Sequence, residues 1–206
     1  MPRKVIIDCD PGIDDALALT LALFDPRLEV AAITAVAGNV PADRATLNVQ
    51  AIVERLDPPR YPRLGAATAA EDVPYTDGRH LNGPDGLGGA GLEVSKLARQ
   101  HPAEKLISDE VRTAPGDITI ICLGPLTNVA RALAREPDLA DLISRIVIRG
   151  GCVNGIGDVT PCAECNIYAD PAAARAIFKS PITSCPSTRS KSRGIGHSSG
   201  ALTREP

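Results

Sequence analysis

Residues 5–18, VIIDCDPGIDDALA, place four carboxylates within eight positions, where a predicted strand passes into a predicted helix. Residues 5–7 are a short β-branched run, as in strands that are buried on both faces of a sheet. Pro11 and Gly12 predict the turn, because both residues favour tight backbone turns. The apolar run at 16–24 then predicts a helix. The four acids, called the acidic cluster below, are Asp8, Asp10, Asp14 and Asp15.

The acidic cluster needs an explanation beyond helix capping. A helix dipole stabilises one or two acids in the first helical turn, but not four. Carboxylates this close repel one another, so some must be protonated, turn into solvent or share a cation. Calcium and magnesium prefer carboxylate, carbonyl and water oxygens, so the cluster predicts a hard divalent ion. A solvated helix N-terminus with incidental acids is the alternative, and the apolar sequence on both sides disfavours it.

Strand and helix patterns alternate along the chain, which predicts an α/β fold with a doubly wound, mostly parallel sheet and helices on both faces. Ligands of such sheets bind beyond the carboxyl ends of the strands. Unusual polar residues stand at those ends, including Asn39 and Asn128, although Asn128 can instead cap the following helix. The predicted strands are 5–8, 30–37, 118–123 and 145–148, and the predicted helices are 14–24, 42–56, 103–112, 127–135 and 172–178.

The composition is that of an ordinary globular domain, and it excludes several classes of function. A net charge of −3 offers no basic surface for nucleic acid. No apolar run reaches the ~18 residues of a membrane span. The N-terminus has no signal-peptide pattern, so we expect a cytoplasmic protein without a membrane partner. Cys162 and Cys165 have CxxC spacing, but no second pair accompanies them, which disfavours zinc or a redox motif.

Two segments depart from the alternating pattern. Residues 76–92 are too rich in glycine for regular structure and predict either a binding loop or a surface connection. Residues 180–206 are rich in serine and lack apolar periodicity, so we expect a disordered or non-native tail. The predicted organisation is therefore an α/β domain at 1–179, followed by the tail at 180–206.

Four segments resemble one enzyme family in order and spacing. They are DCDPGIDDALAL (8–19), ITAVAGNV (33–40), GPLTNVARAL (124–133) and GGCVNGIGDVTPCAECNIYADPAAA (150–174). Together they are similar to the inosine–uridine preferring nucleoside hydrolases, which are calcium-dependent ribonucleoside N-ribohydrolases. The resemblance implies hydrolysis of the N-glycosidic bond to ribose and free base, with a nucleoside such as inosine or uridine as the partner. It also implies a possible homo-oligomer.

The resemblance further implies a role for individual residues. Asp10 would bind Ca²⁺ and act as the general base that deprotonates water, and Asp15 and the carbonyl oxygen of Leu123 would complete this part of the metal site. The substrate-binding residues would be Asp14, Asn39, Asp158, Glu164 and Asn166, and Asp8 would orient the loop behind them.

The chain also departs from the family pattern. Asn82 stands where the family has histidine, Arg149 replaces methionine, Asp158 replaces asparagine and Cys165 replaces an aromatic residue. Family members are longer, and their C-terminal part supplies another calcium-binding aspartate after a histidine. The tail contains neither in that arrangement, so we expect a truncated or frame-shifted chain whose C-terminal part is missing.

Two other functions remain open. An incomplete site predicts a catalytically inactive remnant that binds ribose or calcium. Clustered aspartates also occur in metal-dependent phosphatases, but the proline after Asp10 and the absence of a phosphate-binding loop disfavour that interpretation.

Overall fold

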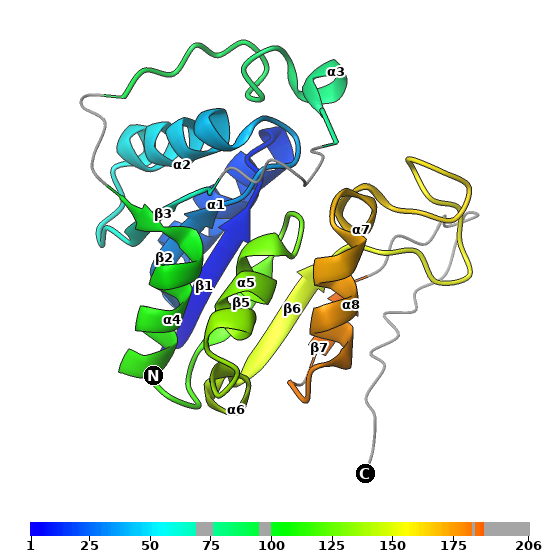
Figure 1. The fold of residues 1–206 in the computed structure, drawn as a ribbon. Helices are drawn as coiled ribbons and strands as arrows, with labels where there is room; N and C mark the ends of the chain where they lie inside the picture. The colour runs from blue at the N-terminus through cyan, green and yellow to red at the C-terminus, as the bar shows by residue number, and fades with distance from the viewer. Residues whose placement is uncertain (69–75, 95–99, 183, 188–206) are drawn as a thin grey trace, which may run out of the picture.

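The computed structural model describes residues 1–68, 76–94, 100–182 and 184–187, and it contains one seven-stranded sheet (Figure 1). Every neighbouring pair of strands is parallel, and the strand order is β4-β3-β2-β1-β5-β6-β7. The strands are β1 (Arg3–Cys9), β2 (Leu28–Ala35), β3 (Arg63–Ala66), β4 (His101–Pro102), β5 (Thr119–Cys122), β6 (Arg145–Arg149) and β7 (Ser184–Ser187).

The order of the strands reverses beside the central strand β1. From β1 the chain builds β2, β3 and β4 outward in one direction, and then returns to place β5 on the other side of β1. The register pairs Asp8 with Cys122, so β1 and β5 end at the same level of the sheet. The crevice outside the carboxyl ends at such a reversal is the usual ligand position in open α/β sheets.

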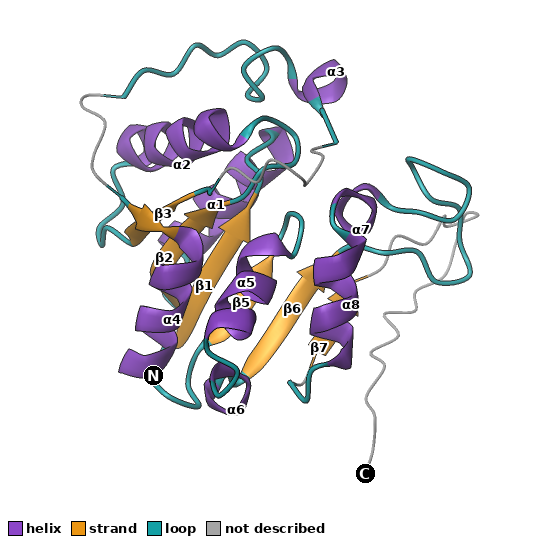
Figure 2. Cartoon of the chain, in the orientation of Figure 1, coloured by secondary structure: helices purple, strands orange, loops and turns teal. Residues whose placement is uncertain are grey.

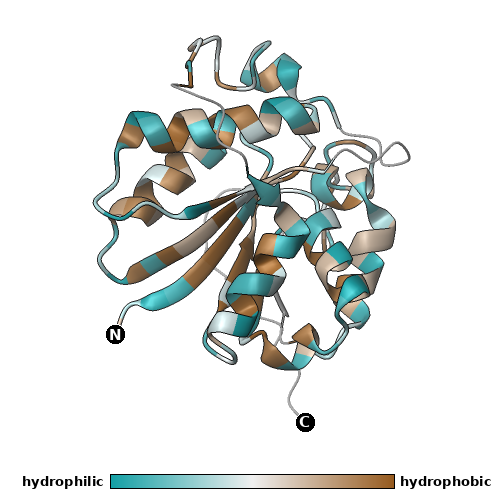
Figure 3. Cartoon of the chain, turned by 60° about the vertical axis from the view of Figure 1, so that its left-hand side comes forward, coloured by the Kyte–Doolittle hydropathy of each residue, from teal (hydrophilic) through white to brown (hydrophobic). Residues whose placement is uncertain are grey.

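Helices cover both faces of the sheet (Figure 2), and the strands alternate their side chains between two cores. Ile6 packs with residues of α4, α5 and α8, whereas Val5 and Ile7 pack with residues of α1 and α2. Figure 3 shows mainly hydrophobic strands and helices of mixed character, as expected for strands enclosed by helices. The helices are α1 (Ile13–Phe24), α2 (Ala42–Leu56), α3 (Arg79–Asn82), α4 (Ala103–Thr113), α5 (Thr127–Arg135), α6 (Leu139–Leu142), α7 (Cys165–Ala169) and α8 (Pro171–Lys179).

The predicted fold class is confirmed, and each predicted strand and helix is present within two residues at either end. The glycine-rich segment is not wholly irregular, because Gly78 precedes the one-turn helix α3; that part of the prediction is wrong. Strand β7 lies in the segment predicted to be a tail, and residues 188–206 of that segment lie outside the described residues. None of the helices in the described ranges has the length and apolar character that crossing a membrane requires.

Helix α1 allows a direct test of the buried core. Leu19 is 0% exposed and packs in the core between α1, α2 and the sheet, whereas Leu17 on the same helix is 62% exposed. We expect Leu19→Ala to lower the free energy of unfolding by about 2–5 kcal/mol, because it leaves a cavity. Leu17→Ala, which deletes the same atoms, should change it by less than about 0.5 kcal/mol. Urea denaturation measures both, and equal losses would contradict the assigned orientation of α1.

Candidate functional site

The acidic cluster lies where the topology predicts a ligand. Asp8 is in β1, Asp10 follows the end of that strand, and Asp14 and Asp15 belong to the first turn of α1. Asp8, Asp10 and Asp15 are buried, with 0%, 3% and 5% exposure, whereas the side chain of Asp14 is 64% exposed. The sequence thus brings three carboxylates into the protein interior and leaves the fourth at its surface.

Asp8 is held between two neighbouring elements. Its Oδ1 accepts hydrogen bonds from Thr34 Oγ1 on β2 at 2.6 Å and from Asn128 Nδ2 on α5 at 2.8 Å. Asn128 Nδ2 also donates to the carbonyl oxygen of Ala35 at 2.8 Å, and α5 begins after Leu126 without a side-chain cap. Asn128 therefore joins α5 to β1 and β2 rather than capping its own helix, and Asp8 fixes the strand ends behind the site.

Asp10 is enclosed by backbone. Its Oδ2 accepts a hydrogen bond from the Asn39 backbone N–H at 2.9 Å, and Asn39 Nδ2 donates to the Asp10 carbonyl oxygen at 2.9 Å. A Cβ on Gly38 would overlap Asp10 Oδ2, and a Cβ on Gly124 would lie 2.6 Å from Asp10 Oδ1. The Asp10 side chain thus requires glycine on both sides.

Burial raises the pKa of all three interior carboxyl groups. The pKa of Asp8 rises to about 7, mainly through burial, although the hydrogen bonds from Thr34 and Asn128 oppose the rise. The pKa of Asp10 rises well above its usual value through burial and the charge of Asp15. The pKa of Asp15 rises to about 7 through burial and the charge of Asp14, and the charge of Arg149 opposes that rise. The site is therefore short of positive charge.

Asn82 connects the glycine-rich segment to the acidic cluster, and sequence reasoning did not assign it a role. Its Oδ1 accepts a hydrogen bond from the Ile13 backbone N–H at 3.1 Å, at the start of α1. Its Nδ2 donates to Asn39 Oδ1 at 3.2 Å. Asn82 thus ties α1 to Asn39, which in turn holds Asp10. No local pattern predicts a contact between residues so far apart in sequence.

The last of the four family-like segments supplies polar groups from the start of α7, around residues 164–166. Glu164 is 3% exposed, and its Oε2 accepts backbone N–H bonds from Gly151 at 2.9 Å, Asn166 at 3.1 Å and Ile167 at 3.3 Å. Glu164 therefore caps α7. Asn166 Nδ2 donates to the carbonyl oxygen of Leu123 at 2.8 Å, which connects α7 to the end of β5.

Arg149, the last residue of β6, is a cation that lies between the acidic cluster and Glu164. Its Nη2 lies 3.8 Å from Asp14 Oδ2, and its Nη1 lies 3.5 Å from Glu164 Oε1. Its carbonyl oxygen accepts a hydrogen bond from Asn166 Nδ2 at 3.1 Å, which holds its backbone. The sequence identified Arg149 only as a departure from the family pattern.

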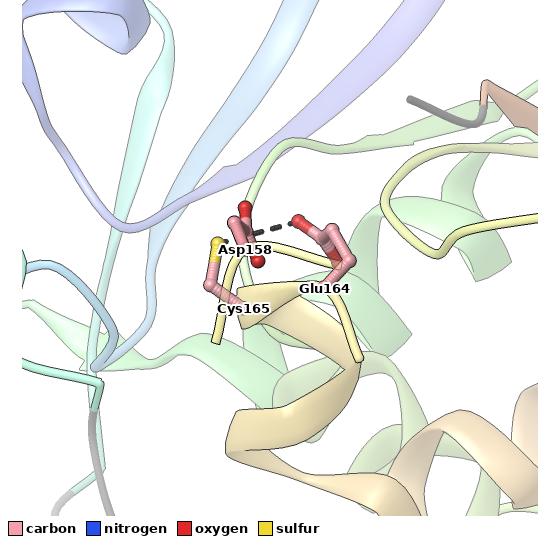
Figure 4. A group of neighbouring side chains, drawn as sticks. All are labelled: Asp158, Glu164 and Cys165. Atoms are coloured by element: carbon pink, nitrogen blue, oxygen red, sulfur yellow. Dashed lines mark hydrogen bonds between the residues drawn. The ribbon is translucent and has the colours of Figure 1, made fainter. Parts of the chain in front are cut away.

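Asp158 and Cys165 lie beside Glu164 (Figure 4), and Cys165 Sγ donates to Glu164 Oε1 at 3.3 Å. One potential ligand atom from each of these three side chains lies within 4.8 Å of the others. Across the described ranges, this is the one such group of three acidic, cysteine or histidine side chains, and it does not include Asp10 or Asp15. Any cation bound by Asp10 and Asp15 would thus need oxygens from other groups, such as backbone carbonyls.

The structure brings most of the predicted residues to one edge of the sheet, the carboxyl ends of β1, β5 and β6. Asp8, Asp10, Asp15 and Asn39 form its first part, and Leu123, Glu164 and Asn166 form its second part. Asp14 is exposed and contacts the second part through Arg149, and Asp158 is exposed beside Glu164. The arrangement offers carboxylates for proton transfer, oxygens for a cation, and amide and carboxylate groups for hydroxyls.

Comparisons with known proteins agree with this geometry. The chain matches the family described as inosine-uridine preferring nucleoside hydrolase over residues 5–197. It is 43% identical over 183 residues to the pyrimidine-specific ribonucleoside hydrolase RihA of Salmonella schwarzengrund, and 42% identical over 185 residues to RihA of Klebsiella pneumoniae. Each of these matches covers 88% of this chain and 58% of the relative.

Solved structures give the same result. A plant nucleoside hydrolase superposes with a TM-score of 0.80 at 38% identity, covering 90% of this chain and 59% of that one. The purine-preferring ribonucleoside hydrolase from Gardnerella vaginalis superposes with a TM-score of 0.81 at 31% identity, covering 89% and 60%. The chain thus spans less than two thirds of the length of these relatives. Over the part that it spans, it belongs to the inosine–uridine preferring nucleoside hydrolase family.

Proposed function

We propose that this protein hydrolyses the N-glycosidic bond of a ribonucleoside, releasing ribose and the free base. The observation that carries the proposal is the burial of Asp10 and Asp15 at the strand-order reversal of a nucleoside hydrolase fold. The names of its relatives differ in the base, which is a pyrimidine for RihA and a purine for the Gardnerella enzyme. The common feature of these substrates is ribose, so the proposal concerns the sugar and the bond to it.

The residues around Asp10 fit a divalent cation. Asp8 Oδ2 and Asp15 Oδ2 are buried and have no hydrogen-bond partner among the described groups. A buried carboxylate without a partner is energetically unfavourable. The raised pKa values of Asp8, Asp10 and Asp15 are the consequence, because burial and mutual repulsion disfavour the charged form. Asp10, Asp15 and the Leu123 carbonyl are hard oxygen donors, as calcium prefers. A bound calcium ion would contribute by lowering the pKa of the attacking water.

Asp10 is the residue that we assign as general base. Asn39 holds its Oδ2 through a backbone N–H, so the carboxylate has one fixed orientation. A carboxylate whose pKa is raised by burial accepts a proton from water more readily at neutral pH than an exposed one. Gly38 and Gly124 leave room for this carboxylate, because a Cβ at either position would overlap its oxygens.

The ribose would be held mainly by the second part of the site. Glu164 Oε2 is occupied by three backbone N–H groups, so we assign the sugar-hydroxyl contact to Oε1, beside its neighbours Cys165 and Arg149. Asn166 uses its Nδ2 on backbone carbonyls, so its Oδ1 is the atom that we assign to the substrate. Asp14, Asn39 and Asp158 are the further candidates for hydroxyl contacts. Orienting the sugar in this way lowers the entropic part of the barrier.

Replacement of Asp10 tests the enzymatic role. Asp10→Asn keeps the shape of the side chain but removes the base, so ribose release from uridine and inosine should fall by roughly 10²–10⁴-fold. A reducing-sugar assay in the presence of calcium measures it. The matched control is Asp141→Asn, which neutralises an exposed aspartate in α6. Activity of Asp10→Asn equal to that of the control would contradict the assignment.

The same assay separates the other two functions. Calcium binding detected by calorimetry, without ribose release from any nucleoside, indicates the inactive remnant. Release of phosphate from nucleotides, without release of ribose from nucleosides, indicates the metal-dependent phosphatase.

Asp8 predicts an unusual pH dependence of stability. Its pKa is about 7 in the folded chain against 3.8 as the usual value, so folding favours the protonated form. The associated stability is present below about pH 4 and is lost as the pH rises through 7. In a chelator, the melting temperature of the wild type should therefore fall between pH 5 and pH 8. Asp8→Asn, which carries no titrating group, should reduce that fall. Thermal melts across this pH range measure the effect, with Asp141→Asn as the control. If the melting temperature of Asp8→Asn falls as much as that of the wild type, the raised pKa of Asp8 is contradicted.

A further inference from the structure

We infer that Arg149 is a built-in counter-charge of the candidate site, which holds Asp14 and Glu164 when no cation is bound and weakens the binding of a divalent ion beside Asp10 and Asp15. The inference rests on the proposed function, because it concerns the ion proposed there. Arg149 is a positioning residue in this view, since it acts on other side chains rather than on the substrate.

The position of Arg149 supports this role. The guanidinium bridges Asp14 in α1, 3.8 Å away, and Glu164 before α7, 3.5 Å away, so it joins the two parts of the site. The Arg149 carbonyl oxygen is fixed by Asn166, and the side chain is 47% exposed, at the surface of the cluster. The two ion pairs are longer than hydrogen bonds. The guanidinium therefore acts on these two acids mainly through its charge.

The surroundings of Arg149 are acidic on both sides. Asp14 and Asp15 lie near it in α1, Asp10 lies near it after β1, and Glu164 lies beside it before α7. Asp14 adjoins Asp15 in α1, so a guanidinium 3.8 Å from Asp14 also lies near the carboxylates that would hold the ion. A fixed positive charge beside these acids repels a second cation, because both charges act on the same few carboxylates. The same charge therefore stabilises the metal-free site and lowers its affinity for metal.

Arg149 also lies beside the neighbouring group of Asp158, Glu164 and Cys165, through its contact with Glu164. These side chains offer potential ligand atoms within 4.8 Å of one another, but Glu164 Oε1 already lies 3.5 Å from Arg149 Nη1. The guanidinium thus already supplies a positive charge beside the Glu164 member of this group.

The experiment compares Arg149→Met with Arg145→Met in the full chain. Arg145 is exposed at the opposite end of the same strand, so the two variants change the net charge equally. We expect Arg149→Met to bind calcium about three- to tenfold more tightly than Arg145→Met in calorimetry, because a nearby positive charge is gone. In EDTA, Arg149→Met should melt about 2–4 °C lower than Arg145→Met. Arg149→Lys retains the charge, so its calcium affinity and its melting temperature in EDTA should match those of Arg145→Met.

A gain in calcium affinity cannot arise from general structural damage, which would weaken binding. Calcium affinity of Arg149→Met that equals or falls below that of Arg145→Met overturns the inference. If the wild type and both variants bind no calcium, the cation in the proposed function fails, and the melts in EDTA decide the inference separately. The counter-charge is then supported if Arg149→Met melts at a lower temperature than Arg145→Met and Arg149→Lys does not. It is refuted if Arg149→Met and Arg145→Met melt at the same temperature.

Discussion

The Asp8 carboxylate, buried at the end of the central strand, is bonded to Thr34 on β2 and to Asn128 on α5. These contacts join β2, on one side of β1, to α5, the helix that follows β5 on the other side of β1. Because β1 and β5 end at the same level, the turn after each strand reaches the same place. The Asp10 carboxylate and the Leu123 carbonyl depend on this alignment, as does everything proposed for the site.

Much of the fold could be predicted from the sequence because its strands are short β-branched runs and its helices are periodic. The runs at 5–7 and 146–148 are of this kind, and both lie within strands. The segments that were missed are too short to carry a period. His101–Pro102 forms a strand of two residues, and Leu139–Leu142 forms a helix of four. Such elements exist because a neighbouring strand or helix supports them, and local sequence does not contain that information.

The site, like the fold, could be predicted from the sequence only in part. Asp10 and Asn39 follow buried strands, so the edge at which they lie was predictable from topology alone. The partners of Asn128 and Asn82 are 120 and 69 residues away in the chain, beyond any local pattern. Glu164 and Asn166 were recognised only by their resemblance to a family. The capping bonds of Glu164 show that a residue in such a motif also supports the fold.

The two glycines around Asp10 limit how this protein can change. Gly38 and Gly124 lie in different loops, yet each faces the same carboxylate at a distance that excludes even a methyl group. We therefore expect random mutagenesis of this edge of the sheet to recover few variants at positions 38 and 124 that keep the Asp10 side chain in place. A library aimed at this edge of the sheet should hold them constant and vary residues whose side chains already reach solvent.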